Sequence, residues 1–305
     1  MIDLLIIGGG PAGLTAAIYA ARRGSSVKLF ESVQLGGYMN ATTVIENYPG
    51  FDKITGQDLS KKMASQVKAL KVEVIEKEVM KLAKESGAFK VECADGSTHE
   101  GSAIIIGTGA EHRTLGTKGE KEFTGKGVSY CATCDGPLFS GKTTAIIGGG
   151  NTALTAALFL ADICSRVYLV HRRNEFRAEA ALVEQVKANE KIEIVFNSVP
   201  IEIKGDKFVN ALSVANVESK EKKDIQVEGI FINVGVKPAS ELALGLGIEL
   251  DEKGNVKVNL HDCSTSVPGA YAAGDVTGAF KQIVTATAQG ALSATSAINY
   301  LKKKN

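Results

Sequence analysis

The sequence predicts an α/β protein that contains two Rossmann-like nucleotide-binding units. Two observations lead to this prediction. A glycine signature of the GxGxxG type follows a short apolar run at the start of the chain, and the same pattern returns in register near the middle. The length agrees, because 305 residues correspond to about two domains at roughly 150 residues each. Each unit is then long enough to bury a core of its own.

The first unit begins with a strand–helix–strand pattern. Residues 4–7 are an unbroken apolar run, which is typical of a buried parallel strand, and residues 14–23 and 27–30 predict a helix and a second strand. Residues 58–70 then predict an amphipathic helix. Short alternating strands follow up to residue 100, before a buried strand at 103–106.

The glycines between the first strand and helix have separate physical roles. Gly8 makes the tight turn, Gly10 lets a pyrophosphate approach the backbone, and Gly13 lets the helix pack on the strand. Glu31 ends the second strand, where a carboxylate can accept a hydrogen bond from a ribose hydroxyl. We therefore expect a dinucleotide here, with its phosphates at the helix N-terminus.

A long polar loop follows at residues 34–49 and contains Gly36 and Gly37. Loops of this length in compact domains usually have a role, so it is a candidate for wrapping a cofactor; the alternative is a plain surface connection. The buried strand at 103–106 also ends in a glycine-rich turn, which contains Thr108 and Gly109.

The second unit repeats the first. Residues 146–157 align with residues 6–17 without a gap, and the register continues to the end of the second strand. His171 therefore occupies the position that Glu31 has in the first unit. Such a repeat indicates two Rossmann-type units and two dinucleotides.

The strand-end residues differ between the repeats. The second unit has His171-Arg172-Arg173 there, with Arg177 one turn further on. Guanidinium groups bind a 2′-phosphate that a carboxylate would repel, and each charge-assisted contact contributes about 1.5–3 kcal/mol. Two contacts would favour NADP over NAD by about 10²-fold or more. The alternative is a solvated basic turn. Ala153 in place of the third glycine is an accepted variant of the fingerprint.

The last part of the chain contains a hairpin-like stretch at 201–227 and an apolar strand at 229–234. Near the end, a short strand runs into Gly274-Asp275, and a helix is predicted at about 282–300. Asp275 would lie at the carboxyl edge of the sheet, where ligands bind in open α/β folds. The alternative role for this carboxylate is a helix or turn cap.

Between the two glycine signatures lies Cys131-Ala132-Thr133-Cys134-Asp135. Two cysteines with this spacing can close a disulfide ring, and one thiolate can attack an external disulfide while the other resolves the intermediate. Asp135 is close enough in sequence to transfer a proton. Taken alone, the pair is equally consistent with half a zinc site or coincidence. A four-cysteine zinc site needs a second close pair, and Cys93, Cys164 and Cys263 are isolated in sequence, so we expect no metal.

Composition excludes several classes of protein. The net charge of +1, from 35 basic and 34 acidic residues, provides no field to attract nucleic acid or an anionic membrane. No segment approaches the roughly 18 apolar residues of a membrane span, and the N-terminus has no signal-peptide pattern. The sparse cysteines favour a reducing compartment. We therefore expect a soluble cytoplasmic protein.

With these residues identified, the chain resembles the low-molecular-weight thioredoxin reductases from end to end. The resemblance rests on GGGPAG at 8–13, ENYPG at 46–50, CATCDG at 131–136, GGGNTA at 148–153, HRRxxxRA at 171–178 and YAAGDV at 271–276. The set in this order is highly specific, although no single motif is unique.

The resemblance implies two cofactor sites. FAD would be held by residues of the first unit and the C-terminal part: Gly8, Gly10, Pro11, Ala12, Gly13, Glu31, Gly36, Gly37, Asn47, Thr108, Gly109, Gly274, Asp275, Lys281, Gln282 and Ile283. NADPH would be held by residues of the second unit: Gly148, Gly150, Asn151, Thr152, Ala153, His171, Arg172, Arg173 and Arg177. It also implies three-layer β/β/α domains, with an NADPH domain at about 114–243 inserted in an FAD domain formed by 1–113 and 244–305.

The implied reaction passes hydride from NADPH to FAD, then reduces the Cys131–Cys134 disulfide, and finally the disulfide of thioredoxin or a thioredoxin-like partner. Cys134 would lie next to the flavin, Cys131 would attack the partner, and Asp135 would be the general acid and base. A homodimer is the family expectation. Because the cysteines and the nicotinamide site share one domain, we also expect that domain to rotate about linkers near 113–116 and 238–244. The alternatives are a flavoprotein of this fold with another disulfide partner, such as a peroxiredoxin system or a small-molecule dithiol oxidase, a ferredoxin–NADP reductase, and a nucleotide sensor.

Overall fold

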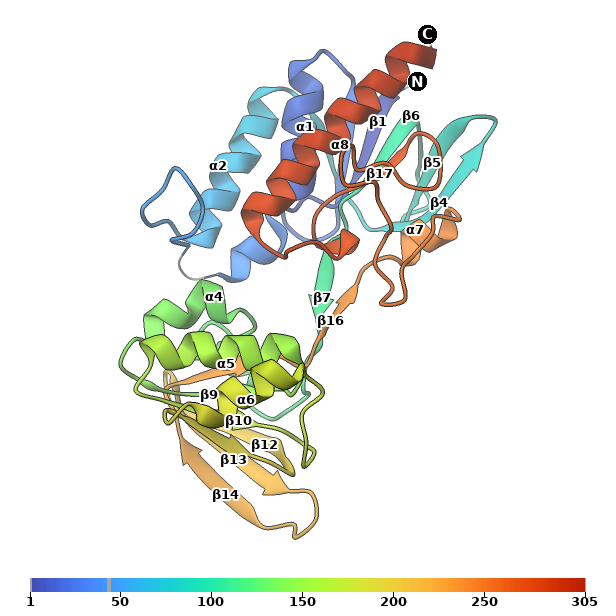
Figure 1. Cartoon of the computed structure of the whole chain (residues 1–305). Coiled ribbons are helices and arrows are strands. Elements are labelled where there is room, and N and C mark those ends of the chain that lie inside the picture. Colours follow the sequence, from blue (N-terminus) through green and yellow to red (C-terminus); the bar gives the residue numbers. More distant parts are fainter. Residues whose placement is uncertain (1, 43–44, 305) are drawn as a thin grey trace. The chain divides into compact units, whose positions relative to one another are not determined.

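The structure is a computed structural model that describes residues 2–42 and 45–304. Within these residues the chain forms two compact units (Figure 1). Of the described residues, unit 1 contains 2–42, 46–111 and 237–304, and unit 2 contains Ile45 and residues 112–236. The chain therefore leaves unit 1, completes unit 2 and returns.

Unit 1 is a seven-stranded sheet whose long helices lie on one side (Figure 1). Its helices are α1 (Pro11–Arg22), α2 (Gly56–Ala69), α7 (Glu241–Gly245) and α8 (Ile283–Lys304), with 3-10 turns η1 (Gly37–Ala41) and η3 (Asp275–Thr277). Its strands are β1 (Ile2–Ile7), β2 (Val27–Glu31), β3 (Glu73–Glu76), β4 (Val79–Glu85), β5 (Ala88–Cys93), β6 (Thr98–Ile106) and β17 (Ala270–Ala272).

The order of the unit 1 sheet is β3-β2-β1-β6-β5-β4, with β17 also pairing with β6. Strands β3, β2, β1, β6 and β17 run parallel, and β4, β5 and β6 form an antiparallel meander. The apolar run at 4–7 lies at the centre of the sheet, where Leu4, Leu5 and Ile6 are fully buried. The predicted buried parallel strand is therefore confirmed, and β1 leads directly into the first glycine turn.

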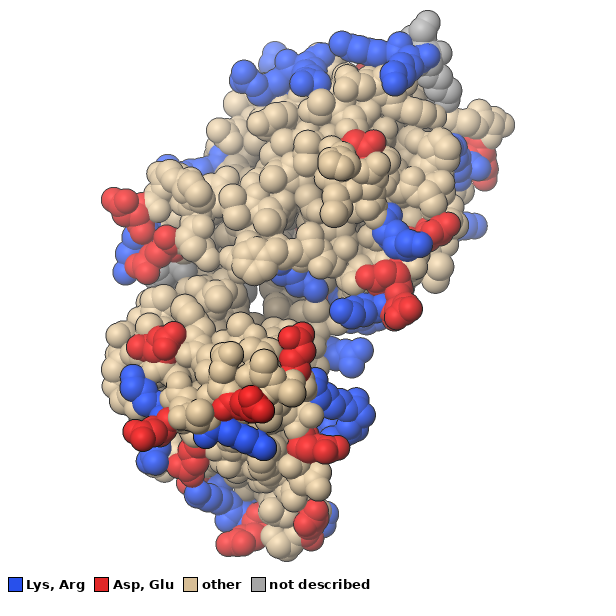
Figure 2. All heavy atoms as spheres, in the orientation of Figure 1, with Lys and Arg blue, Asp and Glu red and all other residues tan. Residues whose placement is uncertain are grey.

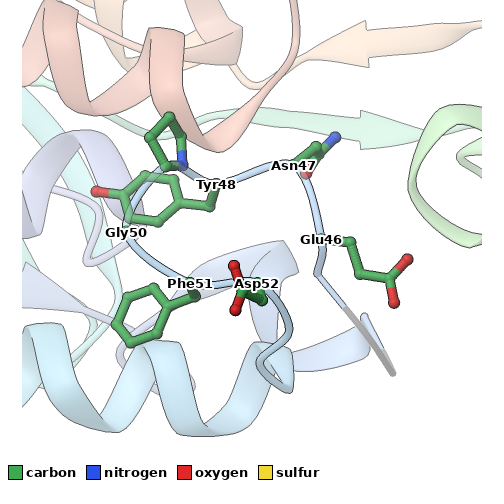
Figure 3. Close-up of a pocket in the computed structure, with 7 residues that line it drawn as sticks. Glu46, Asn47, Tyr48, Gly50, Phe51 and Asp52 are labelled. Carbon is green, nitrogen blue, oxygen red and sulfur yellow. The ribbon is translucent and has the colours of Figure 1, made fainter.

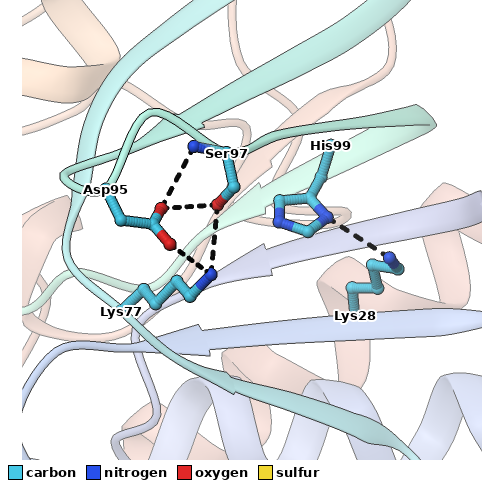
Figure 4. Close-up of polar contacts among 5 residues, drawn as sticks. All are labelled: Lys28, Lys77, Asp95, Ser97 and His99. Carbon is cyan, nitrogen blue, oxygen red and sulfur yellow. Dashed lines mark hydrogen bonds and ion pairs between the residues drawn. The ribbon is translucent and has the colours of Figure 1, made fainter.

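A polar cluster closes the turn between β5 and β6 (Figure 4). Asp95 accepts hydrogen bonds from Ser97 N at 3.1 Å and Ser97 Oγ at 2.6 Å, and pairs with Lys77 Nζ at 2.5 Å. These bonds, with Lys77 the largest contributor, hold the pKa of Asp95 below its usual value. On β6, His99 Nδ1 lies 3.3 Å from Lys28 Nζ on β2. These contacts thus join the β5–β6 turn to the residue after β3, and β6 to β2.

Unit 2 is a five-stranded parallel sheet of order β11-β10-β9-β15-β8 with an antiparallel sheet β12-β13-β14. Its helices are α3 (Glu120–Phe123), α4 (Ala132–Asp135), α5 (Asn151–Ile163) and α6 (Ala180–Ala188), with the 3-10 turn η2 (Gly136–Phe139). Its strands are β8 (Val128–Ser129), β9 (Thr143–Ile147), β10 (Arg166–Val170), β11 (Ile192–Val195), β12 (Ser198–Gly205), β13 (Val209–Asn216), β14 (Lys222–Gln226) and β15 (Gly229–Ile232).

Both connections between the units are short strands, β7 (Ala110–His112) and β16 (Val236–Pro238), which pair with each other. On the face shown in Figure 2, acidic and basic side chains are interspersed, as expected from a net charge of +1. No helix among the described residues combines the length and hydrophobicity needed to cross a bilayer.

Candidate active site

The first glycine turn connects β1 to α1. Gly8 has φ +100°, and a Cβ there would lie 2.3 Å from Gly107 O. A Cβ on Gly13 would lie 1.9 Å from Gly8 O, so only glycine lets α1 pack this closely on the turn. Gly10 is the N-cap of α1, receives no side-chain cap and has open space where a Cβ would be. The first N–H groups of α1 therefore face room for a ligand.

Glu31 lies across this turn at the end of β2. Its Oε2 accepts a hydrogen bond from Gly9 N at 2.7 Å, and its Oε1 accepts one from Val33 N at 2.9 Å. The carboxylate is thus fixed beside the glycines, as the spacing predicts. Because each carboxylate oxygen can accept two bonds, the acid can still receive one from a ribose hydroxyl.

Two distant segments converge on the same turn. Gly36 N donates to Gly9 O at 2.8 Å, and a Cβ on Gly37 would lie 3.2 Å from Gly10 Cα. From the C-terminal part, a Cβ on Gly274 would lie 3.0 Å from Ala12 Cβ at the start of α1. The fold therefore brings together three of the segments to which the resemblance assigns FAD.

Asp275 follows Gly274 at the start of η3. Burial raises the pKa of its carboxyl, and the nearby Lys281 partly opposes that rise. Asp275 is the first residue of η3, and the N-cap position before it is Gly274. A half-buried acid next to α1 is a suitable acceptor for a ligand hydroxyl.

The loop that carries Asn47 is tied to the start of α8. Asn47 Nδ2 donates to Gln282 Oε1 at 3.0 Å, next to Ile283, where α8 begins. Residues 46–52 of this loop line a hollow of their own (Figure 3). In the glycine-rich turn after β6, Thr108 Oγ1 donates to Ala239 O at 2.6 Å, and Gly109 has φ +74°. Thr108 and Gly109 therefore also join the first and last parts of unit 1.

Gln289 is a residue that sequence reasoning missed. Its Oε1 accepts hydrogen bonds from Gly274 N at 2.8 Å and Thr277 Oγ1 at 3.2 Å. It thereby holds the turn that presents Asp275. A glutamine within a long helix has no local signal for such a role, because the bond is defined only once α8 packs on η3.

The second glycine turn connects β9 to α5 in unit 2. Gly150 is the N-cap of α5, again without a side-chain cap, and the nearest atom to a Cβ there is Arg177 O at 3.9 Å. His171 lies against the turn, since a Cβ on Gly149 would be 2.2 Å from its ring. Ala153 replaces the third glycine and is buried.

His171 is buried at the end of β10. Its Nε2 has no hydrogen-bond partner among the described residues. Burial is the main cause that lowers the pKa of His171, and the positive charges of Arg172 and Arg173 lower it further. The His171 ring, held in a largely buried position, therefore lies against the glycine turn.

The arginines and Asn151 surround the same turn. Arg177 N donates to Gly149 O at 2.7 Å, while its side chain and that of Arg172 are exposed. Among the described residues, no acidic side chain forms an ion pair with Arg172, Arg173 or Arg177, so their charges are available to an anion. Asn151 Nδ2 donates to Glu179 Oε1 at 2.7 Å, and Glu179 N donates to Asn151 Oδ1 at 2.9 Å. Thr152, the next residue of α5, is exposed, and Glu179 is a second residue that the sequence analysis missed.

The residues present fit two dinucleotides. Each unit provides a long helix whose N-terminus is uncapped, with a cap glycine that leaves space for phosphates. The strand end carries an acid, Glu31, in unit 1 and is followed by arginines in unit 2, which would suit an unphosphorylated ribose in the first and a 2′-phosphate in the second.

Cys131 and Cys134 form a disulfide, with their Cα atoms 5.3 Å apart. Cys131 is the N-cap of the short helix α4, and its Sγ accepts a hydrogen bond from Cys134 N at 3.2 Å. Both cysteines are half-buried, and Thr133 between them is exposed. Cys93, Cys164 and Cys263 are buried free thiols, and no cluster of three or more metal-binding side chains occurs among the described residues.

Asp135 ends α4 directly after the second cysteine. Its Oδ2 accepts a hydrogen bond from Ser129 Oγ at 2.6 Å, and its buried Oδ1 has no partner among the described residues. Burial raises the pKa of Asp135, and the Ser129 bond partly opposes that rise. A carboxyl that keeps its proton nearer to neutral pH is suited to exchange protons with thiols.

Glu120 links the first connection between the units to the redox segment. Its buried carboxylate accepts hydrogen bonds from Leu115 N at 3.0 Å, Gly116 N at 2.8 Å and Thr117 N at 3.2 Å. It also accepts one from the hydroxyl of Tyr130, the residue before the first cysteine, at 2.8 Å. No motif or spacing in the sequence singles out this glutamate.

Residues 2–290 match the family described as pyridine nucleotide-disulphide oxidoreductase. The chain belongs to this family. A thioredoxin reductase of Listeria monocytogenes is 40% identical over 304 residues, covering 99% of this chain and 94% of that protein. The expected resemblance to thioredoxin reductases is confirmed, and FAD and NADPH are the cofactors of this group of oxidoreductases.

Solved structures of thioredoxin reductases have the same fold. The enzyme of Streptococcus pyogenes is 39% identical, with 99% of both chains covered and a TM-score of 0.94. The enzyme of Lactococcus lactis, in what is described as its FR conformation, is 40% identical, with 99% of this chain and 100% of that chain covered and a TM-score of 0.69. The predicted α/β fold with two Rossmann-like units is thus confirmed for this oxidoreductase.

Proposed function

We propose that this chain is an NADPH-dependent flavoprotein that reduces the disulfide of thioredoxin or of a thioredoxin-like protein. The balanced reaction is NADPH, a proton and oxidised thioredoxin giving NADP and reduced thioredoxin. The observation that carries the proposal is the Cys131–Cys134 disulfide next to the half-buried Asp135, in a unit whose nucleotide turn is surrounded by unpaired arginines. When bound, NADPH and FAD supply the electrons that reduce this disulfide.

We assign FAD to unit 1 and NADPH to unit 2. In unit 1 the open N-terminus of α1 would bind the pyrophosphate, Glu31 a ribose hydroxyl and Asp275 a further hydroxyl. In unit 2 the N-terminus of α5 would bind the second pyrophosphate, and the arginines after β10 the 2′-phosphate. The remaining residues that the resemblance assigns to each cofactor belong to the same units.

The chemistry of the reduced cysteine pair follows from its hydrogen bonds. Cys134 N–H points to Cys131 Sγ, which favours a thiolate on Cys131 and so suits it to attack the partner's disulfide. Cys134 would then attack Cys131 Sγ in the mixed disulfide, which releases reduced partner and restores the internal disulfide. Asp135 would take the proton from one thiol and return it to the leaving sulfur.

The proposal includes rotation of unit 2 about its two connections. The cysteines and the arginine-lined turn both belong to unit 2, so one fixed arrangement can hardly serve hydride delivery, disulfide reduction and docking of a protein substrate. Two related structures of nearly equal identity, 39% and 40%, have TM-scores of 0.94 and 0.69, which supports rearrangement within this family. A covalent crosslink between the units should abolish turnover, and full activity of the crosslinked protein would contradict the rotation.

We further propose a cytoplasmic homodimer. Helices α1 and α8 pack against each other and expose three large apolar side chains: Tyr19 at 45%, Val284 at 41% and Leu292 at 41%. No charged residue lies between 283 and 300 on α8, so this surface suits a second copy of the chain. Light scattering on the purified protein should give the mass of two chains, and the mass of one chain would contradict the homodimer.

The function is tested by kinetics of the FAD-loaded protein with NADPH, NADH and a panel of thioredoxins. We expect NADPH-dependent reduction of at least one thioredoxin. Cys131→Ser and Cys134→Ser variants should keep NADPH-dependent bleaching of the flavin and lose disulfide reduction. Rapid oxygen consumption without any thioredoxin would instead indicate a dithiol oxidase, and a flavin that NADPH does not bleach would indicate a nucleotide sensor.

A further inference from the structure

Ser129 is a buried serine that makes contact with both ends of the redox segment. It ends β8 and is 6% exposed. Its Oγ donates to Asp135 Oδ2 at 2.6 Å and accepts a hydrogen bond from Cys131 N at 3.0 Å. Cys131 O lies 3.4 Å from the same oxygen. Because the hydroxyl has a single proton, the short bond to Asp135 is its main donor bond.

The Asp135 carboxyl depends on this hydroxyl for its position. Ser129 is its only side-chain donor among the described residues, since Oδ1 has no partner there. No charged side chain shifts the pKa of Asp135; burial raises it, and the Ser129 bond alone opposes the rise. Removing the hydroxyl therefore leaves a half-buried carboxyl without any neighbour that fixes its rotamer.

The same hydroxyl also fixes the backbone of the first cysteine. By accepting the bond from Cys131 N, it sets the start of α4, where Cys131 is the N-cap. Ser129 Oγ is thus hydrogen-bonded both to the amide of Cys131, the proposed nucleophile, and to the carboxyl of Asp135, which would exchange its proton. General acid–base catalysis is sensitive to such placement, because proton transfer needs a group held within hydrogen-bond reach.

We propose that Ser129 is a positioning residue of the disulfide exchange, which holds Oδ2 of Asp135 and the amide of Cys131 so that Oδ1 of Asp135 is left for proton transfer with the cysteine thiols. The proposal rests on the proposed function of the cysteine pair. It assigns no contact between Ser129 and either cofactor or the protein substrate.

The first test is the Ser129→Ala variant of the FAD-loaded protein. Loss of one hydrogen bond to a charged group should lower kcat for thioredoxin reduction by about 10-fold, while KM for NADPH stays unchanged. Ser129→Thr keeps the hydroxyl and should restore most of the rate. The matched control is Ser213→Ala, because Ser213 is also a buried serine of unit 2 that donates to a carboxylate, Asp224 Oδ1 at 2.5 Å. The control should change kcat by less than about 2-fold.

The second test needs no turnover. The rate at which iodoacetamide alkylates the reduced cysteine pair is measured against pH in the wild type, Asp135→Asn and Ser129→Ala. The titration step that is absent from Asp135→Asn belongs to Asp135. In Ser129→Ala this step should move to higher pH. The move is upward because the anion loses the bond that stabilises it. In the Asp135→Asn background, Ser129→Ala should lower kcat much less than it does in the wild type, since only its bond to Cys131 N remains to be lost.

Additive losses in the double variant, or an unchanged alkylation profile in Ser129→Ala, would overturn the proposal and leave a purely structural serine. These outcomes are distinct from failure of the proposed function. If the wild-type protein reduces no thioredoxin, the alkylation profiles still report whether Ser129 acts on Asp135.

Discussion

The two glycine turns share one backbone pattern but place different side chains at the same position. In unit 1, Gly9 donates to the Glu31 carboxylate, and in unit 2, Gly149 lies against the His171 ring. Neither middle glycine leaves room for a Cβ, so both turns need glycine for packing rather than for the ligand. The comparison suits our assignment of cofactors, in which the turns are a common phosphate site and the residues after the second strand distinguish the two dinucleotides.

The third position of the signature gives the largest test of this comparison. Gly13→Ala puts a Cβ 1.9 Å from Gly8 O, which should destabilise unit 1 by about 3 kcal/mol or more and prevent retention of FAD. Unit 2 already has Ala153 there, so Ala153→Gly should cost only about 1 kcal/mol. Flavin absorbance of the purified variants and urea unfolding measure both effects. Equal losses in the two variants would show that the turns are equivalent.

The second test concerns the arginines of unit 2. The double variant Arg172→Ala/Arg177→Ala should raise KM for NADPH by about 10²-fold, because two charge-assisted contacts are lost, while KM for NADH changes little. Steady-state kinetics with both nucleotides measure the ratio. Arg166→Ala is the control, since Arg166 lies at the opposite end of β10 and pairs with Glu193 at 3.3 Å. A similar rise for both nucleotides would argue against a 2′-phosphate site.

The third test concerns the acid of unit 1. In Glu31→Gln one of the two backbone N–H groups loses its acceptor, and the ribose loses a charged partner, so we expect about 10-fold weaker FAD binding. Fluorescence titration of the apoprotein with FAD gives this ratio. Glu73→Gln is the control, because Glu73 is an exposed acid of the same unit that pairs with Lys28. Unchanged affinity in Glu31→Gln would leave the acid a structural role in the turn.

The smallest expected effect is a pH dependence of the free energy of unfolding, caused by His171 of unit 2. The folded protein lowers the pKa of His171, so between the folded and unfolded pKa values the unfolded state binds more protons. The His171 contribution to stability is therefore fully present above about pH 6.5 and is lost as the pH falls through that value. Urea unfolding from pH 8 to 5 should show wild type losing stability relative to His171→Gln. If the free energies of unfolding of wild type and His171→Gln changed in parallel with pH, this prediction would be wrong.

The sequence predicted what has a local pattern, namely the two glycine turns, their different strand-end residues and the cysteine pair with its neighbouring acid. Each of these depends on spacing within a few tens of residues. Three side chains that hold the site in place were missed. Gln289 accepts a hydrogen bond from Gly274, Glu179 accepts one from Asn151, and Glu120 accepts one from Tyr130. Their partners are 10 to 28 residues away in sequence and become neighbours only after helices and loops have packed, so no periodicity signals them.

The Glu120 carboxylate limits which residues can act as the hinge for a rotation between the units. It clamps residues 115–117 to the segment that carries the cysteines, so these residues must travel with unit 2. On the return path, Ala239 is bonded to Gly109 and Thr108 and must stay with unit 1. Any turning is thereby confined to residues 112–114 and 236–238, most of which belong to the paired strands β7 and β16. The pairing of the two strands makes both connections move together, so any rotation of unit 2 would involve them as one hinge.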